Sequence, residues 1–148
     1  MTDVIGGSLA ISASGLAAEG LRLGGIASNL ANASTTRTPE GGPYKRRNVI
    51  FATQGMESDF ADTIASMMDD GARRGVAVTD VTLDQSQPRL VFDPGHPDAN
   101  PEGYVAYPNV NPVLEMVDLT TATRAYEANV QAINAARRMA EAALTIGG

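Results

Sequence analysis

The chain has 148 residues, and 11 Lys and Arg stand against 17 Asp and Glu, so the formal net charge is -6. One domain is the usual outcome at this length. The acidic balance argues against nucleic acid as a partner, because phosphate neutralisation requires clustered basic residues and only residues 45–47 form a dense cluster. Cys is absent, which excludes disulfides, thiolate nucleophiles and Cys-based zinc sites.

The first residues resemble neither a membrane anchor nor a cleaved signal peptide. The longest uncharged run, Val4 to Ala18, is interrupted by Gly and Ser and falls short of the roughly 20 apolar residues of a membrane span. No basic residue precedes Arg22, whereas a signal peptide begins with a basic region. If the protein is exported, we expect a machine other than the Sec pathway.

Helical periodicity marks the N-terminal segment and predicts a helix over about 5–33. Its leucines recur at every seventh position, which is the spacing of one apolar stripe in a heptad pattern: Leu9, Leu16, Leu23 and Leu30. From this pattern alone, a closed helical hairpin and an assembly interface are equally good interpretations.

Glycines interrupt the same segment at 15, 20, 24 and 25. Each costs about 1 kcal/mol relative to alanine in a helix, so this helix requires neighbours. The spacing of Gly20 and Gly24 favours close helix packing over phosphate binding, because no strand precedes them.

All eight prolines lie between Pro39 and Pro112, and this Gly/Pro-rich middle predicts a small antiparallel β unit. Clusters of Gly, Pro, Asn and Asp separate the expected strands: residues 48–52, 76–79, 81–83, 89–92 and 104–107. The second and third runs are out of phase, which predicts a β-bulge near Asp80. Residues 57–74 place apolar side chains at helical spacing and predict a short amphipathic helix.

The C-terminal segment predicts a second helix over about 112–146. Asn111 is a suitable N-cap, Pro112 suits the first helical position, and Glu115 lies near the positive end of the helix dipole. At about 1.5 Å per residue this helix would be roughly 51 Å long, which exceeds the diameter of a small domain. Such a helix must project from its domain or pack against a partner.

The sequence contains one candidate for a general base or metal ligand, His96. The acidic and amide residues after it match the first positions of a calcium loop, yet Asn109 occupies position twelve, where a bidentate Glu is required. A second His and a nucleophilic Ser motif are missing. We therefore interpret residues 93–103 as a turn and expect no catalytic residue, metal, cofactor or small-molecule substrate.

The basic residues 45–47 are interpreted as a solvated strand end or a salt-bridging patch. The acidic stretch at 57–70 is their expected partner, and contact with nucleic acid is not expected on an acidic chain.

Four segments resemble the bacterial flagellar axial proteins, the family that comprises rod, hook and hook-filament junction subunits. Residues 28–35, SNLANAST, are similar to the signature that ends the N-terminal helix in that family. Residues 41–51, 93–111 and 115–144 resemble the proximal rod proteins within it. The similarity covers nearly the whole chain and departs at about 54–74, where this sequence carries extra residues.

The resemblance implies a structural subunit of the flagellar proximal rod and no enzyme. Such a subunit passes through the flagellar type III export apparatus and polymerises in the periplasm into a hollow drive shaft, which transmits torque and lets exported subunits pass. The implied partners are other rod proteins, further copies of this chain and the export apparatus, with the MS ring and periplasmic ring proteins as neighbours. The alternative is a soluble monomeric helical-hairpin module that binds proteins.

We accordingly predict an α+β fold in which long N- and C-terminal helices pack as an antiparallel coiled coil, with a small antiparallel β-rich middle region. The expected segments are 1–36 for the N-terminal helix and export or assembly, 37–110 for the β-rich outer region with an insertion at about 54–74, and 111–148 for the C-terminal helix. The family signature implies that Asn29 and Asn32 end the first helix and bond loop backbone. The residues expected at the assembly interface are Leu9, Leu16, Leu23, Ile26, Leu30, Asn29, Asn32, Leu119, Tyr126, Val130, Ile133 and Leu144.

Overall fold

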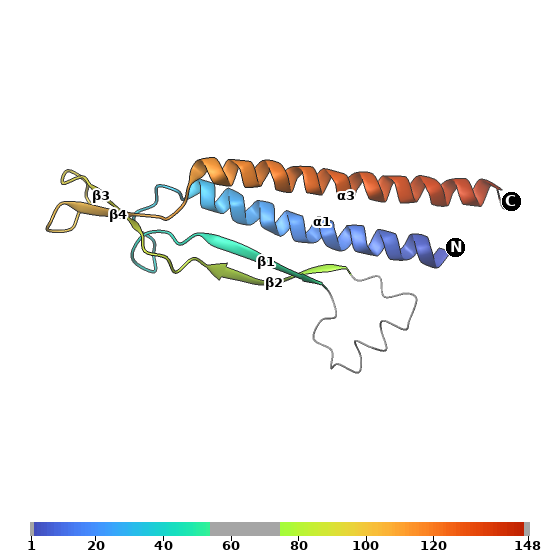
Figure 1. The fold of residues 1–148 in the computed structure, drawn as a ribbon, viewed down its shortest axis with the longest axis horizontal. Helices are drawn as coiled ribbons and strands as arrows, with labels where there is room; N and C mark the ends of the chain where they lie inside the picture. Colours follow the sequence, from blue (N-terminus) through green and yellow to red (C-terminus); the bar gives the residue numbers. More distant parts are fainter. Residues whose placement is uncertain (1, 54–74, 147–148) are drawn as a thin grey trace, which may run out of the picture. The chain divides into compact units, whose positions relative to one another are not determined.

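The computed structural model describes residues 2–53 and 75–146, which form two long helices and four strands (Figure 1). The elements follow one another as α1 (Thr2–Ala31), β1 (Arg47–Thr53), β2 (Val76–Leu83), β3 (Arg89–Phe92), β4 (Tyr104–Tyr107) and α3 (Pro112–Ile146). This order confirms the α+β class and both predicted helices. Helix α1 starts and stops slightly before the expected bounds of 5 and 33, a difference that is common at helix ends.

The strands form two sheets of two strands each, β1 with β2 and β3 with β4. The third and fourth strands are antiparallel, with Arg89 opposite Tyr107 and Phe92 opposite Tyr104. The runs 76–79 and 81–83, expected as separate strands, are one continuous strand, β2. The amphipathic helix predicted at 57–74 and the insertion at 54–74 lie outside the described residues.

The chain divides into two compact units, each assembled from segments distant in sequence. The first unit combines the start of α1 up to Leu21, the strand residues between Ile50 and Asp80, and α3 from Ala122 onward. The second unit combines Arg22–Val49 with Val81–Thr121. Both helices therefore contribute to both units.

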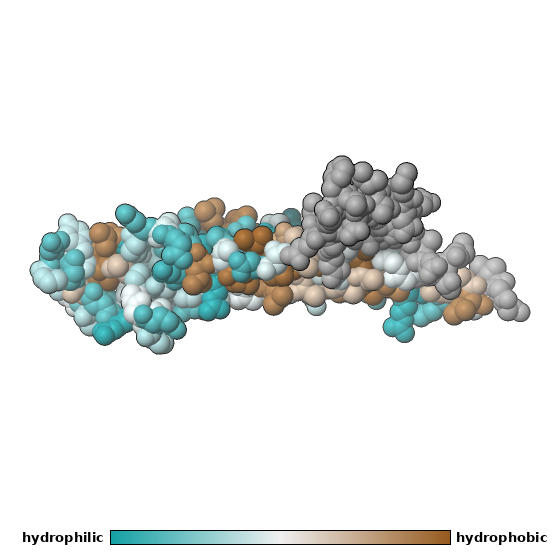
Figure 2. All heavy atoms as spheres, turned by 90° about the horizontal axis from the view of Figure 1, so that it is seen from below, coloured by the Kyte–Doolittle hydropathy of each residue, from teal (hydrophilic) through white to brown (hydrophobic). Residues whose placement is uncertain are grey.

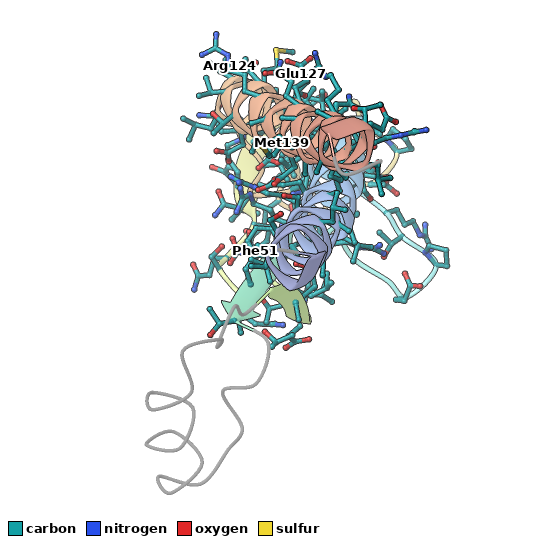
Figure 3. All side chains as sticks on the ribbon, turned by 90° about the vertical axis from the view of Figure 1, so that its right-hand side faces the viewer. Phe51, Arg124, Glu127 and Met139 are labelled. Atoms are coloured by element: carbon teal, nitrogen blue, oxygen red, sulfur yellow. The ribbon has the colours of Figure 1, made fainter. Side chains whose placement is uncertain are left out.

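Small residues make the core of the first unit, where Ala18, Ala122 and Ala136 are buried. A Cβ built on Gly15 would lie 3.0 Å from the Nδ2 atom of Asn129, so α1 and α3 approach closely at this glycine. Arg124 and Glu127 lie on the side of α3 that faces away from α1 (Figure 3). The sheet joins this unit through Val76, whose backbone N–H donates to the hydroxyl oxygen of Ser14 at 3.0 Å.

Larger and more polar side chains make the core of the second unit: Ile26, Asn29, Val105 and Glu115 are buried there. Gly25 lies against β1, since an added Cβ would be 3.2 Å from the Cγ2 atom of Val49. The predicted close packing at Gly20 and Gly24 is wrong, because a Cβ on either would meet none of the described atoms within 4 Å. The glycine in close contact is Gly25, because it faces strand β1. The helical period of α1 alone does not indicate where that strand lies.

None of the helices within residues 2–53 and 75–146 has the length and hydropathy needed to cross a membrane.

Candidate functional site

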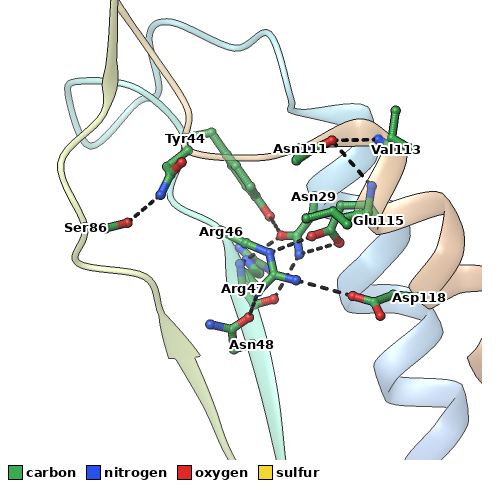
Figure 4. Close-up of polar contacts among 12 residues, drawn as sticks. Asn29, Tyr44, Arg46, Arg47, Asn48, Ser86, Asn111, Val113, Glu115 and Asp118 are labelled. Carbon is green, nitrogen blue, oxygen red and sulfur yellow. Dashed lines mark hydrogen bonds and ion pairs between the residues drawn. The ribbon is translucent and has the colours of Figure 1, made fainter.

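A buried amide, Asn29, connects α1 with the loop before β1 and with α3 (Figure 4). Its side-chain oxygen accepts hydrogen bonds from the backbone N–H of Arg47 at 2.8 Å and from the Tyr44 hydroxyl at 3.0 Å. Its side-chain nitrogen donates to the Arg47 carbonyl at 2.9 Å and to the Glu115 carboxylate at 3.1 Å. Both donors and both acceptor positions of the amide are thus in use, which a buried amide requires.

The Glu115 carboxylate is 1% exposed and lies next to Arg46, whose side chain is 28% exposed. The Arg46 Nε atom is 2.5 Å from one carboxylate oxygen of Glu115, and a terminal guanidinium nitrogen is 3.6 Å from Asp118. Arg46 also contacts the side-chain oxygen of Asn48. A buried carboxylate is costly without such a partner, so the guanidinium stabilises the burial of Glu115.

The start of α3 places Glu115 in this position. The Asn111 side chain accepts from the backbone N–H groups of Val113 and Leu114, which confirms the predicted N-cap. The Glu115 N–H donates to the Asn111 carbonyl at 3.0 Å, so Glu115 lies in the first turn, near the positive end of the helix dipole. We call Asn29, Tyr44, Arg46 and Glu115 the Asn29 network.

The predicted patch at residues 45–47 therefore divides into different roles. Arg46 is paired with α3, while the Lys45 amine donates to the neutral side chain of Gln85 at 3.1 Å. The expected partner stretch, 57–70, lies outside the described residues.

The carboxylate of Asp84 accepts two hydrogen bonds from Ser86. The stronger comes from the Ser86 side chain and the weaker from its backbone N–H, and together they hold the pKa of Asp84 below its ordinary value.

His96 lies in a turn whose backbone is held by hydrogen bonds. The Nδ1 atom of the His96 ring accepts a hydrogen bond from the backbone N–H of Asp98 at 3.1 Å, and the backbone N–H of His96 donates to the Asp93 carbonyl at 3.2 Å. Asp98 in turn accepts from the Thr36 hydroxyl at 2.8 Å and lies 3.7 Å from Arg37. Among the described residues, no three His, Asp or Glu side chains are grouped closely enough to hold a metal ion.

The two asparagines of the family signature differ in their contacts. Asn29 lies within α1 and does not end it, and its side chain bonds the backbone of the first β1 residue, Arg47, where the signature implied loop backbone. Asn32 follows the end of α1, where its side chain donates to the Ser28 carbonyl and accepts from the Thr35 hydroxyl. Asn29 thus holds the loop to the helix, and Asn32 closes the helix end.

Of the other residues predicted at the interface, only Ile26 is buried. The four heptad leucines of α1 are half-buried, as are Leu119, Val130 and Ile133 of α3, whereas Tyr126 and Leu144 are exposed. The buried positions of α3 are Glu115, Ala122 and Ala136, which the search for large apolar residues missed. Their mutual spacing in multiples of seven residues is the sequence signal that could have identified them.

A second group, at helical spacings of three and four residues, was not assigned to the interface by the sequence prediction. Four large apolar residues of the first turns of α3 are more than half exposed, and we call them the α3 collar: Val113, Leu114, Met116 and Val117. The collar is an apolar face opposite the buried Glu115, and a contiguous exposed apolar patch of this kind marks a candidate contact surface.

Comparison with known proteins gives consistent results. A family described as "Flagellar basal body rod FlgEFG protein C-terminal" matches residues 102–146. A protein from Bacillus subtilis named flagellar basal-body rod protein FlgC is 47% identical over 95% of this chain and 96% of its own length. Proteins of the same name from Borreliella burgdorferi and Salmonella typhimurium are 43% and 38% identical, over 94% and 93% of this chain and 95% and 93% of their own lengths.

Proposed function

This chain belongs to the FlgC family of flagellar basal-body rod proteins, and we propose on that basis that it is a structural subunit of the proximal rod. The supporting observation is similarity that runs through both terminal helices and covers more than nine-tenths of each relative. The role is structural rather than enzymatic.

In this role the chain polymerises with other rod proteins and with copies of itself into a hollow drive shaft. The shaft transmits torque and lets exported subunits pass. We place it in the periplasmic part of the basal body, reached through the flagellar type III export apparatus, with the MS ring and periplasmic ring proteins as neighbours. The resemblance of residues 28–35 and 115–144 to axial proteins supports this assignment.

The contacts of α1 with α3 support an antiparallel coiled coil. In the second unit Asn29 bonds Glu115, and in the first unit Gly15 faces Asn129. From one contact to the other, each helix advances by two heptads, and the two helices do so in opposite directions. A heptad register kept on both helices is the geometry of a left-handed coiled coil.

The assembly interface that we propose keeps the half-buried and exposed residues predicted from sequence and adds the α3 collar, whereas Asn29 and Ile26 are buried within the subunit. The heptad leucines of α1 are only half-buried, and Leu144 of α3 is 78% exposed, so apolar surface remains for neighbouring subunits. Burial of one such side chain contributes about 1.5–3 kcal/mol. Several of them covered together are sufficient to hold a subunit in a polymer.

A charge in the collar tests this proposal. Val117→Asp should remove the chain from isolated basal bodies and abolish motility, because an aspartate at a covered apolar contact loses its hydration. Gln131→Asp is the matched control, since Gln131 is an exposed polar residue of the same helix, and it should assemble normally. Melting of the purified variants should be nearly the same, because Val117 is already exposed within the subunit.

The monomeric helical-hairpin module predicts a different result. In that case the chain would be missing from basal bodies, and the purified chain would sediment as a monomer with and without other rod proteins. Either observation contradicts the rod-subunit assignment.

A further inference from the structure

The β3–β4 hairpin exposes apolar side chains on one face. Leu90 and Phe92 are 64% and 63% exposed, and Tyr104, which pairs with Phe92 across the strands, is also exposed. The opposite face of the hairpin carries Val105, which is fully buried in the second unit. Hydrophobic side chains reach the surface at the hairpin end of the view in Figure 2. A two-stranded sheet with one uncovered apolar face is typical of a surface that receives a partner.

The Phe92 ring has a defined position on this face. It meets the Tyr104 ring edge-on, with 5.3 Å between centroids. A Cβ on Gly103 would lie 2.8 Å from the Phe92 ring, so only glycine leaves room for it, and the φ of Gly103, +86°, also favours glycine. An aromatic side chain that is already ordered loses little entropy on binding.

Carboxylates flank the apolar face at the end of the hairpin. Asp93 follows Phe92 and Glu102 precedes the tight glycine, and neither has an ion-pair partner within the described part of the chain. Asp98 differs, because Arg37 and Thr36 already neutralise and bond it. The hairpin therefore presents an aromatic knob with two uncompensated negative charges.

The same unit contains a groove with complementary properties. It has a volume of about 380 Å³ and its apolar lining includes Tyr44 and Leu83, of which Leu83 is exposed. Lys45 and Arg47 also line it, and neither has an ion-pair partner among residues 2–53 and 75–146. Glu40 is the acidic residue of the lining, so the groove carries a net positive charge. We call it the Tyr44 groove.

We infer that the hairpin of one copy seats in the Tyr44 groove of the next copy. Phe92 would cover Tyr44 and Leu83, while Asp93 and Glu102 would approach Lys45 and Arg47. The occupant is a second copy because the two complementary surfaces, with opposite unpaired charges, are carried by the same chain. This inference rests on the proposed function, and it assigns the surfaces through which neighbouring copies meet.

The two surfaces are different, so the contact is heterologous. A heterologous contact repeats from copy to copy and generates a ring or an open helical array instead of a closed two-fold dimer. Such an array is what a rod wall requires.

The lack of Cys in the chain allows an unambiguous cross-linking test. Glu102→Cys and Lys45→Cys would be expressed as two separate full-length chains in the same cells, in place of the natural chain, and basal bodies would be isolated and oxidised. We expect a disulfide-linked dimer when both variants are present and none when either is expressed alone. Thr120→Cys, an exposed position of α3, replaces Lys45→Cys in the control and should give no dimer with Glu102→Cys.

Charge reversal provides the second measurement. Lys45→Glu and Glu102→Lys should each reduce incorporation into basal bodies at least about tenfold, which corresponds to 1.4 kcal/mol, and the double variant should restore it. Circular dichroism of each purified chain should be unchanged, since both side chains are exposed.

The outcomes separate this inference from the rod-subunit proposal. Basal bodies that contain the chain but give no dimer in the mixture overturn the hairpin-groove contact and leave the rod assignment intact. A dimer formed by either variant alone overturns it as well, because the contact would then be two-fold. If the natural chain is missing from basal bodies, the rod assignment itself fails.

Discussion

The two units join the same two helices with different chemistry. In the first unit the buried side chains are alanines, and Gly15 of α1 lies close to Asn129 of α3. In the second unit the helices meet through Asn29 and Glu115, with Arg46 bonded to the carboxylate. Alanines allow close approach but contribute little apolar area and no direction, whereas hydrogen-bonded groups have defined partners.

This difference indicates how the register of the helix pair is set. Buried alanines give a helix pair little preference for one register, because they are small and make no side-chain hydrogen bonds. The Asn29 network cannot slide, since a shift would leave a buried carboxylate and amide without partners. We therefore expect the Asn29 network to fix the register of α1 against α3 within the second unit.

The largest effect is expected from Arg46→Met. This substitution keeps most of the side-chain volume but leaves the buried Glu115 without its guanidinium, and we expect the free energy of unfolding to fall by about 3 kcal/mol. Arg47→Met is the control, because the Arg47 side chain is exposed and its contacts with Asn29 are made by its backbone; the change should stay within about 0.5 kcal/mol. Equal losses in urea denaturation would show that the ion pair does not hold the unit.

A somewhat smaller loss, about 2 kcal/mol, is expected from Asn29→Ala, because Glu115 and the backbone of Arg47 would lose hydrogen-bond partners inside the unit. Asn32→Ala should cost about half as much, since Asn32 is less buried and bonds only groups near the helix end. Thermal unfolding of both variants gives the comparison. A greater loss for Asn32→Ala would assign the register to the helix end instead of the network.

The smallest effect concerns the glycines of the first unit. Gly20→Ala should raise the free energy of unfolding by about 1 kcal/mol, because alanine is the better helix former and the described surroundings leave room. Gly15→Ala should give a clearly smaller gain or a loss, since its Cβ would press on the Asn129 side chain at 3.0 Å. Urea denaturation measures both, and equal gains would mean that the helices are not in close contact at Gly15.

Sequence periodicity was sufficient for the elements whose signals are local. Neither Gly nor Pro interrupts residues 113–146 and Asn111 caps their start, and these features predicted α3 with its observed bounds. The strands at 89–92 and 104–107 were also predicted correctly, because Pro, Gly and Asp bound them on both sides. The sequence predicts two strands in place of β2, because the alternation of apolar and polar residues breaks at Asp80. In the structure, pairing with β1 keeps the backbone extended through that position.

The candidate site was less predictable. Asn29 was named from the family signature, but its partners lie at Tyr44, Arg47 and Glu115, and no local pattern states which distant groups will meet a buried amide. Glu115 was expected as a helix-terminal charge, yet it is among the most buried side chains of the described residues. Burial of a carboxylate depends on a partner brought by another segment, in this case Arg46.

By itself, the sequence determined the two long helices, the short strands between them, the acidic surface charge and the family, because each depends on local propensity, composition or direct similarity. Tertiary structure alone decided which glycines are in close contact, which face of each helix is buried, and that the β3–β4 hairpin leaves its Phe92 face uncovered. The physical reason is that burial and hydrogen bonding are properties of pairs of segments. Their energies depend on distances that the order of residues along the chain does not contain.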